Sequence, residues 1–333
     1  MSHGRRHRPA RKLTEQAVAT GDDVASTETG STEVPPAAPE PAPLAVAPDL
    51  TAGEVLSGVL EREAHRFLGH VGAWSDTALL APTAADVHQA RVALRRVRAN
   101  LRTFGVLVDP TWSAAVRADA AWFGGVLGGV RNLDVLAERL WAQGPLLADE
   151  AEVRAVLAVL ADQTAEARRA LVAASRSERG ERLVAALTSV GDLPLTERAS
   201  QPTRMLSTLL ERAWHDFRNV GRPARRHPTE QSLHRLRLRT KAFRYGCETV
   251  AAAVGKPAER TARAAARLQD RLGLLRDAAA AESWLVVVAS THPELTGAAE
   301  RLAVVERAAA VVDRRGVGRD LREVEHRWRQ WRH

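Results

Sequence analysis

The chain has few aromatic residues, one cysteine, three lysines and no long apolar run. Aromatic residues make up only 4% of the 333 residues, so a hydrophobic core must be built mainly from Ala, Leu and Val. Ala and Leu favour helices. The single cysteine, Cys247, excludes a disulfide framework or a cysteine-based zinc site within one chain.

The sequence also lacks the features that target a chain to a membrane or for secretion. No stretch of 18 apolar residues occurs, so no transmembrane helix is predicted. The N-terminal segment MSHGRRHRPARKL has no apolar region after its basic residues, which is not typical of a secretory signal. We therefore expect a cytoplasmic protein that does not act at a membrane.

Basic charge, in contrast, is abundant and almost entirely arginine. Lys and Arg number 48 against 40 acidic residues, for a formal net charge of +8, and only three of the 48 are lysines. A chain this basic predicts a polyanionic partner: nucleic acid, an acidic membrane or another polyanion. Arginine binds two phosphate oxygens at once through its planar guanidinium. A GC-rich genome would raise the Arg to Lys ratio equally, so the placement of the arginines matters more than their number.

The chain divides into a tail and a helical region. Residues 1–47 are rich in Pro, Ala, Thr, Ser and Glu without a helical period, which predicts a disordered tail. Across residues 48–333, apolar residues recur at three and four positions, and no alternating strand pattern is present. The predicted fold is therefore all-α.

An internal repeat divides the helical region into two copies. Three blocks recur in the same order at offsets of 150, 146 and 145 residues: VLSGVLEREAHRF (55–67) with MLSTLLERAWHDF (205–217), HQARVALRRVR (88–98) with HRLRLRTKAFR (234–244), and LGGVRN (127–132) with LGLLRD (272–277). This order predicts a duplicated helical unit, with repeat 1 over about 50–190 and repeat 2 over about 200–333.

The middle block of each copy carries one histidine and three cations at spacings of three, four and three. On a helix these four positions fall within roughly 80° of arc, so each copy presents them in a row along one face. We call the two rows the basic stripes; they consist of His88, Arg91, Arg95 and Arg98 in the first copy, and His234, Arg237, Lys241 and Arg244 in the second.

Uncompensated charge makes the basic stripes candidates for anion binding. Like charges three and four residues apart repel, and a multivalent anion lying along the row converts that repulsion into binding energy. Acidic residues that could neutralise the stripes are scarce, because residues 87–108 contain none and residues 218–244 contain only Glu230. A linear phosphate polymer fits such a row, although a merely solvated basic face gives the same pattern.

The paired histidines allow three interpretations: a metal ligand, a structural histidine or a contact to phosphate. No two of His65, His88, His215 and His234 have the HxxxH spacing, and the neighbouring cations oppose a metal ion. We expect no metal site. A histidine beside phosphates would hold its proton more tightly, so His88 and His234 predict stronger binding below about pH 7.

A glycine-rich segment, WFGGVLGGVRNLD (122–134), allows two interpretations. It contains neither GxGxxG nor GxxxxGK[ST], so close helix packing is favoured over a phosphate-binding loop. The repeat aligns Gly128 with Gly273, each followed three residues later by an arginine, Arg131 or Arg276. These arginines are placed to reach the same anion from a neighbouring helix.

The motifs HxxRVxxRRxR followed by LGxxRN, and HxxRLxxKxxRY followed by LGxxRD, resemble the CHAD family (conserved histidine α-helical domain) over about residues 50–330. The resemblance implies two four-helix bundles related by pseudo-twofold symmetry, with a basic groove or central cavity between them. It also implies binding of inorganic polyphosphate, often at polyphosphate granules, without catalysis and without a cofactor.

Carried over residue by residue, the resemblance implies that both basic stripes line the anion site and that Arg96 adds to it. The halves are not equivalent, because Ala242 occupies the position of Arg96 in the second copy. Asn132 stands where the family usually has Asp, which weakens the alignment of Arg131.

Two other functions remain as alternatives. A nucleic-acid-binding protein fits the charge, but no helix-turn-helix, RNP or zinc-finger motif is present. A phosphohydrolase needs carboxylates that hold a metal ion, and the basic stripes contain none. The sequence therefore predicts a non-catalytic protein whose partner is inorganic polyphosphate or another polyanion.

Overall fold

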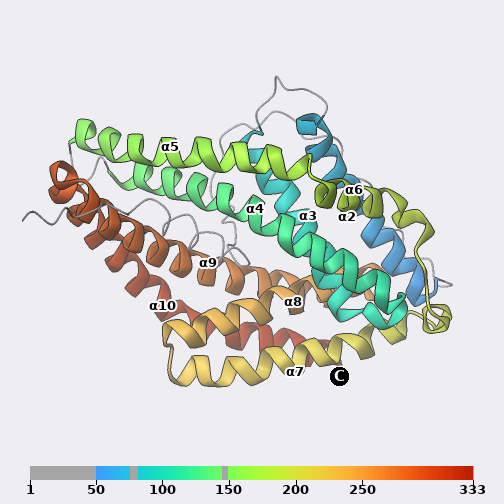
Figure 1. Cartoon of the computed structure of the whole chain (residues 1–333). Coiled ribbons are helices and arrows are strands. Elements are labelled where there is room, and N and C mark those ends of the chain that lie inside the picture. The colour runs from blue at the N-terminus through green and yellow to red at the C-terminus, as the bar shows by residue number, and fades with distance from the viewer. Residues whose placement is uncertain (1–49, 76–81, 145–148, 333) are drawn as a thin grey trace, which may run out of the picture.

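The computed structural model describes residues 50–75, 82–144 and 149–332 (Figure 1). The predicted disordered tail, residues 1–47, lies outside the described residues. Within them the secondary structure is helical except for two isolated β-bridges, Thr51 with Pro202 and Val108 with Leu195. The all-α prediction is confirmed.

The described α-helices follow one another through short connections. They are α2 (Ala52–Ser75), α3 (Ala84–Thr103), α4 (Pro110–Gln143), α5 (Glu150–Ser175), α6 (Glu178–Thr188), α7 (Arg204–Arg226), α8 (Glu230–Val254), α9 (Lys256–Thr291) and α10 (Thr296–Arg332). Short 3-10 turns occur at Gly105–Leu107, Ser189–Asp192, Glu197–Ser200 and Pro293–Leu295.

Local sequence signals set several helix boundaries. Helix α3 begins with a capping box, in which Thr83 accepts a hydrogen bond from the Asp86 backbone N–H and the Asp86 side chain accepts one from the Thr83 N–H. Asp109 caps α4 ahead of Pro110, whose fixed φ suits the first helical turn. Gly255, at φ 75°, turns the chain between α8 and α9 in a conformation that favours glycine.

The helices pack in two consecutive series. Helix α2 packs on α3, α3 on α4 and α4 on α5, and in the second series α7 packs on α8, α8 on α9 and α9 on α10. The three repeated blocks fall in order on α2, α3 and α4 and again on α7, α8 and α9. The two series meet where α3 contacts α8, and again where α4 and α5 contact α9 and α10.

The hydrophobic core is divided into two clusters. The larger one contains residues from both series, including the buried faces of α2, α3, α7 and α8. The smaller one joins only the distal ends of α4, α5, α9 and α10, and includes Leu140, Val156, Leu285 and Leu302. Figure 1 shows these four ends converging at one end of the molecule.

Charged residues occupy the junction between the two clusters. Along α4, Val130 belongs to the larger cluster and Leu136 to the smaller one, with Arg131 and Asp134 between them. Helix α9 repeats the arrangement, because Arg276 and Asp277 separate Leu275 from Ala281. The four long helices therefore carry a polar layer through the interior.

The turn between α5 and α6 provides a test of the fold. An added Cβ at Gly180 would clash with the Ala174 carbonyl oxygen and lie 2.9 Å from the Ser175 carbonyl oxygen. Gly180→Ala must move backbone, so we expect it to lower the free energy of unfolding by about 1–3 kcal/mol in urea denaturation. Gly191→Ala is the control, since no described atom lies within 4 Å of its added Cβ. Equal stability of the two variants would contradict this packing.

Candidate anion-binding site

The basic stripes lie largely in the protein interior. Arg91, Arg237 and Lys241 are only 2%, 1% and 6% exposed, and His88 and Arg95 are partly buried. His234, at the start of the second stripe, is exposed. Most of each stripe therefore faces other helices, because α3 and α8 are each packed by neighbours on several sides.

The first half of the site surrounds His88. Arg91 donates a hydrogen bond from Nη1 to the carbonyl oxygen of Gly124 in α4, at 2.9 Å. Burial, together with the nearby charges of Arg131, Arg95 and Arg91, lowers the pKa of His88 to about 4. Three arginines from α3 and α4 thus gather at one imidazole, which is neutral at pH 7.

The second half of the site surrounds Asp277 in α9. Asp277 is 5% exposed, and burial raises the pKa of its carboxyl group. Four cations lie close enough to oppose that shift: Arg237 and Lys241 of α8, Arg139 of α4 and Arg276 of α9. The two middle residues of the second basic stripe, Arg237 and Lys241, therefore lie near one buried carboxyl group.

Helix α4 joins the two halves through its last turns. Arg131 Nη1 donates to Glu138 Oε1 at 2.9 Å, and Arg139 forms an ion pair with Glu306 of α10. Glu306 is only 1% exposed.

An ion pair from α5 completes the arrangement. Arg168 Nη2 donates to Asp134 Oδ1 at 2.7 Å, and burial raises the pKa of Asp134 despite this cation. The polar residues of α3, α4, α5, α8, α9 and α10 thus form one connected interior.

We call this interior the charged layer. It includes four carboxylates, Asp134, Glu138, Asp277 and Glu306, and eight cations, Arg91, Arg95, Arg131, Arg139, Arg168, Arg237, Lys241 and Arg276.

Arg96 and Arg244 belong instead to a cluster with two other carboxylates. Arg96 contacts Glu63 and Glu248, each at 3.3 Å, and Arg244 Nε donates to Glu248 at 2.7 Å. Burial alone would lower the pKa of Arg96, but Glu248 and Glu63 raise it. The expectation that no carboxylate lies near the basic stripes is therefore wrong for Arg244, and also for Arg237 and Lys241 beside Asp277. Arg96, beside the first stripe, is paired with carboxylates as well.

The glycine-rich segment is continuous helix, so it forms no phosphate-binding loop. Added Cβ atoms at Gly125 and Gly129 would meet no described atom within 4 Å, so close helix packing does not explain these two glycines. At Gly124 an added Cβ would lie 4.0 Å from Arg98 Nη1. The segment places a bare helix surface beside the first basic stripe.

Sequence analysis missed the residues that balance the charged layer. Asp134, Glu138, Arg139, Arg168 and Glu306 lie outside the repeated blocks. One local signal was available: Glu306 interrupts the largely apolar segment LAVVERAAAVV (302–312) together with one arginine. An acidic residue within an apolar helix face indicates a buried ion pair.

The described residues offer neither a metal site nor a membrane-spanning helix. No group of three or more His, Cys, Asp or Glu side chains in the described part of the chain is arranged to hold a metal ion. None of the helices in the described ranges is long and apolar enough to cross a membrane.

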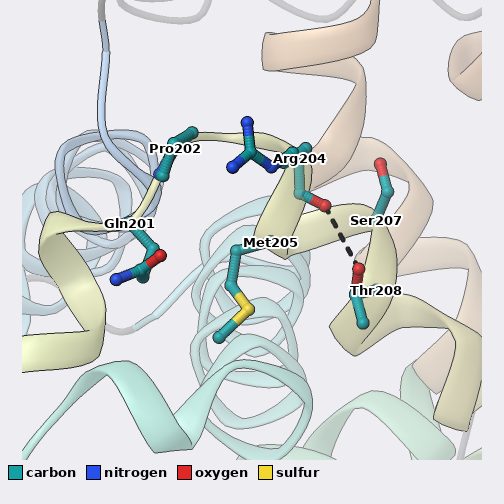
Figure 2. A pocket seen from close by; sticks show the side chains of 6 residues that line it. All are labelled: Gln201, Pro202, Arg204, Met205, Ser207 and Thr208. Atoms are coloured by element: carbon teal, nitrogen blue, oxygen red, sulfur yellow. Dashed lines mark hydrogen bonds between the residues drawn. The ribbon is translucent and has the colours of Figure 1, made fainter.

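A pocket of about 290 Å³ opens at the start of α7 (Figure 2). Its one charged lining residue is Arg204, and Thr208 Oγ1 donates to the Arg204 carbonyl oxygen at 3.5 Å. The pocket shares no residue with the charged layer.

The described residues form an all-helical fold with three buried arginines, Arg91, Arg131 and Arg237. The CHAD domain family model matches residues 60–286, so the chain belongs to the CHAD domain family, as the motifs predicted. The structure resembles the CHAD domain of the plant Ricinus communis, with 21% identity, a TM-score of 0.66 and coverage of 84% of this chain and 95% of that one.

PptA from Streptomyces chartreusis is also similar, with 21% identity, a TM-score of 0.65 and coverage of 82% and 99%. At this identity the structural matches show the fold alone. No curated protein matches the chain.

The Arg139–Glu306 ion pair allows a test of the charged layer. Glu306→Ala leaves the Arg139 guanidinium partly buried without its carboxylate, so we expect a loss of about 3–5 kcal/mol in the free energy of unfolding. The matched control on α10 is Glu300→Ala, whose side chain is exposed. A Glu306→Ala variant as stable as the control would show that this pair is not buried in solution.

The depressed pKa of His88 predicts a pH dependence of stability. The unfolded chain protonates histidine near pH 6.5, whereas the folded chain resists protonation until about pH 4. The unfolded state therefore binds more protons in this window, and stability falls as the pH is lowered through it. We expect His88→Gln to reduce the slope of the free energy of unfolding against pH, between pH 4 and 6.5, by about 1 kcal/mol per pH unit. Denaturation curves at several pH values measure this slope, and an unchanged slope would contradict the buried environment of His88.

Proposed function

We propose that the protein binds linear inorganic polyphosphate, without catalysis, at the charged layer. The convergence of eight cations from five helices, α3, α4, α5, α8 and α9, carries this proposal. Buried like charges are unfavourable unless counter-charges accompany them. A phosphate chain supplies a row of negative charges that would provide such counter-charges.

The Arg131–Glu138 pair of the charged layer can exchange its carboxylate for a phosphate group, because Glu138 is exposed. Glu138 is 58% exposed, whereas its partner Arg131 is 10% exposed. A pair with one exposed carboxylate contributes little to stability, so a phosphate group can replace Glu138 at little cost. Arg131 would then bind phosphate oxygens in the same planar geometry.

Neutral His88 faces the same anion. A bound phosphate would raise the pKa of His88 above its present value of about 4, so binding takes up a proton as the pH falls. The expected strengthening of binding below pH 7 thus arises from protonation that accompanies binding.

We also propose that the two helix series are duplicated four-helix bundles related by pseudo-twofold symmetry. Their support is the order of the repeated blocks on α2, α3 and α4 and on α7, α8 and α9, with α3 and α8 in contact at the centre. The basic stripes lie on this central pair, so duplication would supply both walls of one site. Association with polyphosphate granules in the cytoplasm would follow from the binding.

The alternatives explain the layer less well. Duplex nucleic acid binds exposed phosphate-contacting faces, whereas Arg91, Arg237 and Lys241 are buried. Phosphoryl transfer needs carboxylates that hold a metal ion. Here each layer carboxylate lies beside an arginine, as Asp277 does beside Arg237 and Glu306 beside Arg139.

The test removes two partly buried cations, one from each half. Arg95→Gln with Arg276→Gln should weaken polyphosphate binding and reduce the slope of log affinity against log salt by about 1.5–2, because two phosphate contacts are lost. Titration calorimetry at two salt concentrations measures both quantities. Arg117→Gln with Arg260→Gln is the charge-matched control, since both side chains are exposed on α4 and α9.

Two outcomes would overturn the proposal. One is a variant that keeps the affinity and salt slope of the control while helical circular dichroism is unchanged. The other is release of orthophosphate from polyphosphate by the protein with Mg²⁺ or Mn²⁺, which would indicate an enzyme. Duplex DNA at equal phosphate concentration should compete poorly.

A further inference from the structure

A second group of arginines lines a groove on the outside of the molecule, between α7 and α10. The groove has a volume of about 230 Å³ and is lined by Trp214, Arg218, Arg222, Arg225, Glu325 and Arg329. We call it the outer groove. It shares no residue with the charged layer, and its four arginines face a single carboxylate.

The α7 arginines form an ordered row. Positions 218, 222 and 225 fall within about 60° of arc on one helix face and extend over about 10 Å of its length. Arg218 and Arg222 are exposed, and no carboxylate of the described residues forms an ion pair with either. Arg225 has only a long contact, 3.8 Å, to Glu325.

Helix α10 provides the opposite wall. Arg329 Nε donates to the carbonyl oxygen of Glu325, at 3.2 Å, which directs its cation along α10. Glycines permit the close approach of the two helices: an added Cβ at Gly221 would lie 3.0 Å from Leu321, and one at Gly318 would lie 3.9 Å from Arg225. Cations from both helices therefore flank a narrow channel.

Trp214 lines the groove, and its packing bears on which ligands can bind there. Trp214 is 7% exposed and Trp328 5%, and their rings stack on each other at 5.0 Å with an interplanar angle of 20°. Faces already stacked together cannot receive the bases of a single-stranded nucleic acid, whose binding depends on exposed aromatic platforms. The ligand that matches the groove carries phosphates in a line and no bases.

We propose that the outer groove is a second, independent binding site for a linear phosphate chain. The inference rests on the proposed function only in the choice of polyphosphate as ligand. A chain long enough to reach both sites gains affinity from the second contact, because its second binding event is intramolecular. A chain too short to span them occupies the sites separately.

The experiment uses the full chain and titration calorimetry with tripolyphosphate and with long-chain polyphosphate. Arg218→Glu with Arg222→Glu should remove one of two classes of tripolyphosphate site and weaken long-chain binding at least about tenfold. Arg117→Glu with Arg260→Glu, which alters the net charge equally at exposed positions, should do neither. Circular dichroism and urea denaturation confirm that each variant is folded.

The outcomes separate the two sites. Equal binding by the outer-groove variant and the control variant would overturn this inference. It would do so even if Arg95→Gln with Arg276→Gln abolished binding at the charged layer. Loss of binding in the outer-groove variant, with none in the layer variant, supports the outer groove and overturns the layer. An oligothymidylate that displaces tripolyphosphate from the outer groove at lower phosphate concentration would overturn the choice of a base-free chain.

Discussion

The burial of charged side chains between two hydrophobic clusters is the constraint on which the rest of the structure depends. Charges taken out of water cost free energy that only good pairing offsets. Four carboxylates enter the charged layer from α4, α9 and α10, and each has a cation beside it. Guanidinium suits such a position because it is more weakly hydrated than ammonium and keeps its proton. Lys241 is the one lysine among the eight cations of the layer.

The helical class could be predicted, and so could the helix face that each basic stripe occupies, because spacing on a helix decides which side chains share a face. The different surroundings of His234 and Arg244 could not. Whether such a face is buried in the protein or exposed to solvent could not be predicted. Arg91 and Leu94 are both buried, since α3 is surrounded by α2, α4 and α8. A helix packed on several sides has no polar face whose pattern indicates solvent.

The pairing of charges was the other unpredictable part. Glu63 and Arg96 are 33 residues apart, and Arg139 and Glu306 are 167 apart. The lack of acidic residues close to the stripes in the sequence therefore did not predict which acidic residues lie close to them in the folded protein. The repeat did predict that Arg131 lies near the first basic stripe, as it does beside His88. The block that contains Arg131 recurs on the helix that follows each stripe. Neighbouring helices joined by short connections pack together.

Helix α8 separates the two basic regions of the molecule. Lys241 lies beside Asp277 in the charged layer, whereas Phe243 packs against Trp214 and Trp328 beneath the outer groove. Side chains two residues apart on a helix differ in direction by about 200°, so Lys241 and Phe243 point to nearly opposite sides of α8. One turn of α8 therefore contributes to the charged layer on one side and to the aromatic residues beneath the outer groove on the other. Four aromatic residues, Trp214, Phe217, Phe243 and Trp328, contact one another on this side of α8.

Under the proposed function, anion binding at the charged layer would be coupled to the stability of the fold. The smaller hydrophobic cluster consists of the distal ends of α4, α5, α9 and α10, and it connects with the larger cluster through the layer. Repulsion among the layer cations acts against holding these helices together. An anion that binds the folded layer and not the unfolded chain lowers the free energy of the folded state. An anion bound at the layer, as proposed above, would therefore stabilise the packing of these distal ends.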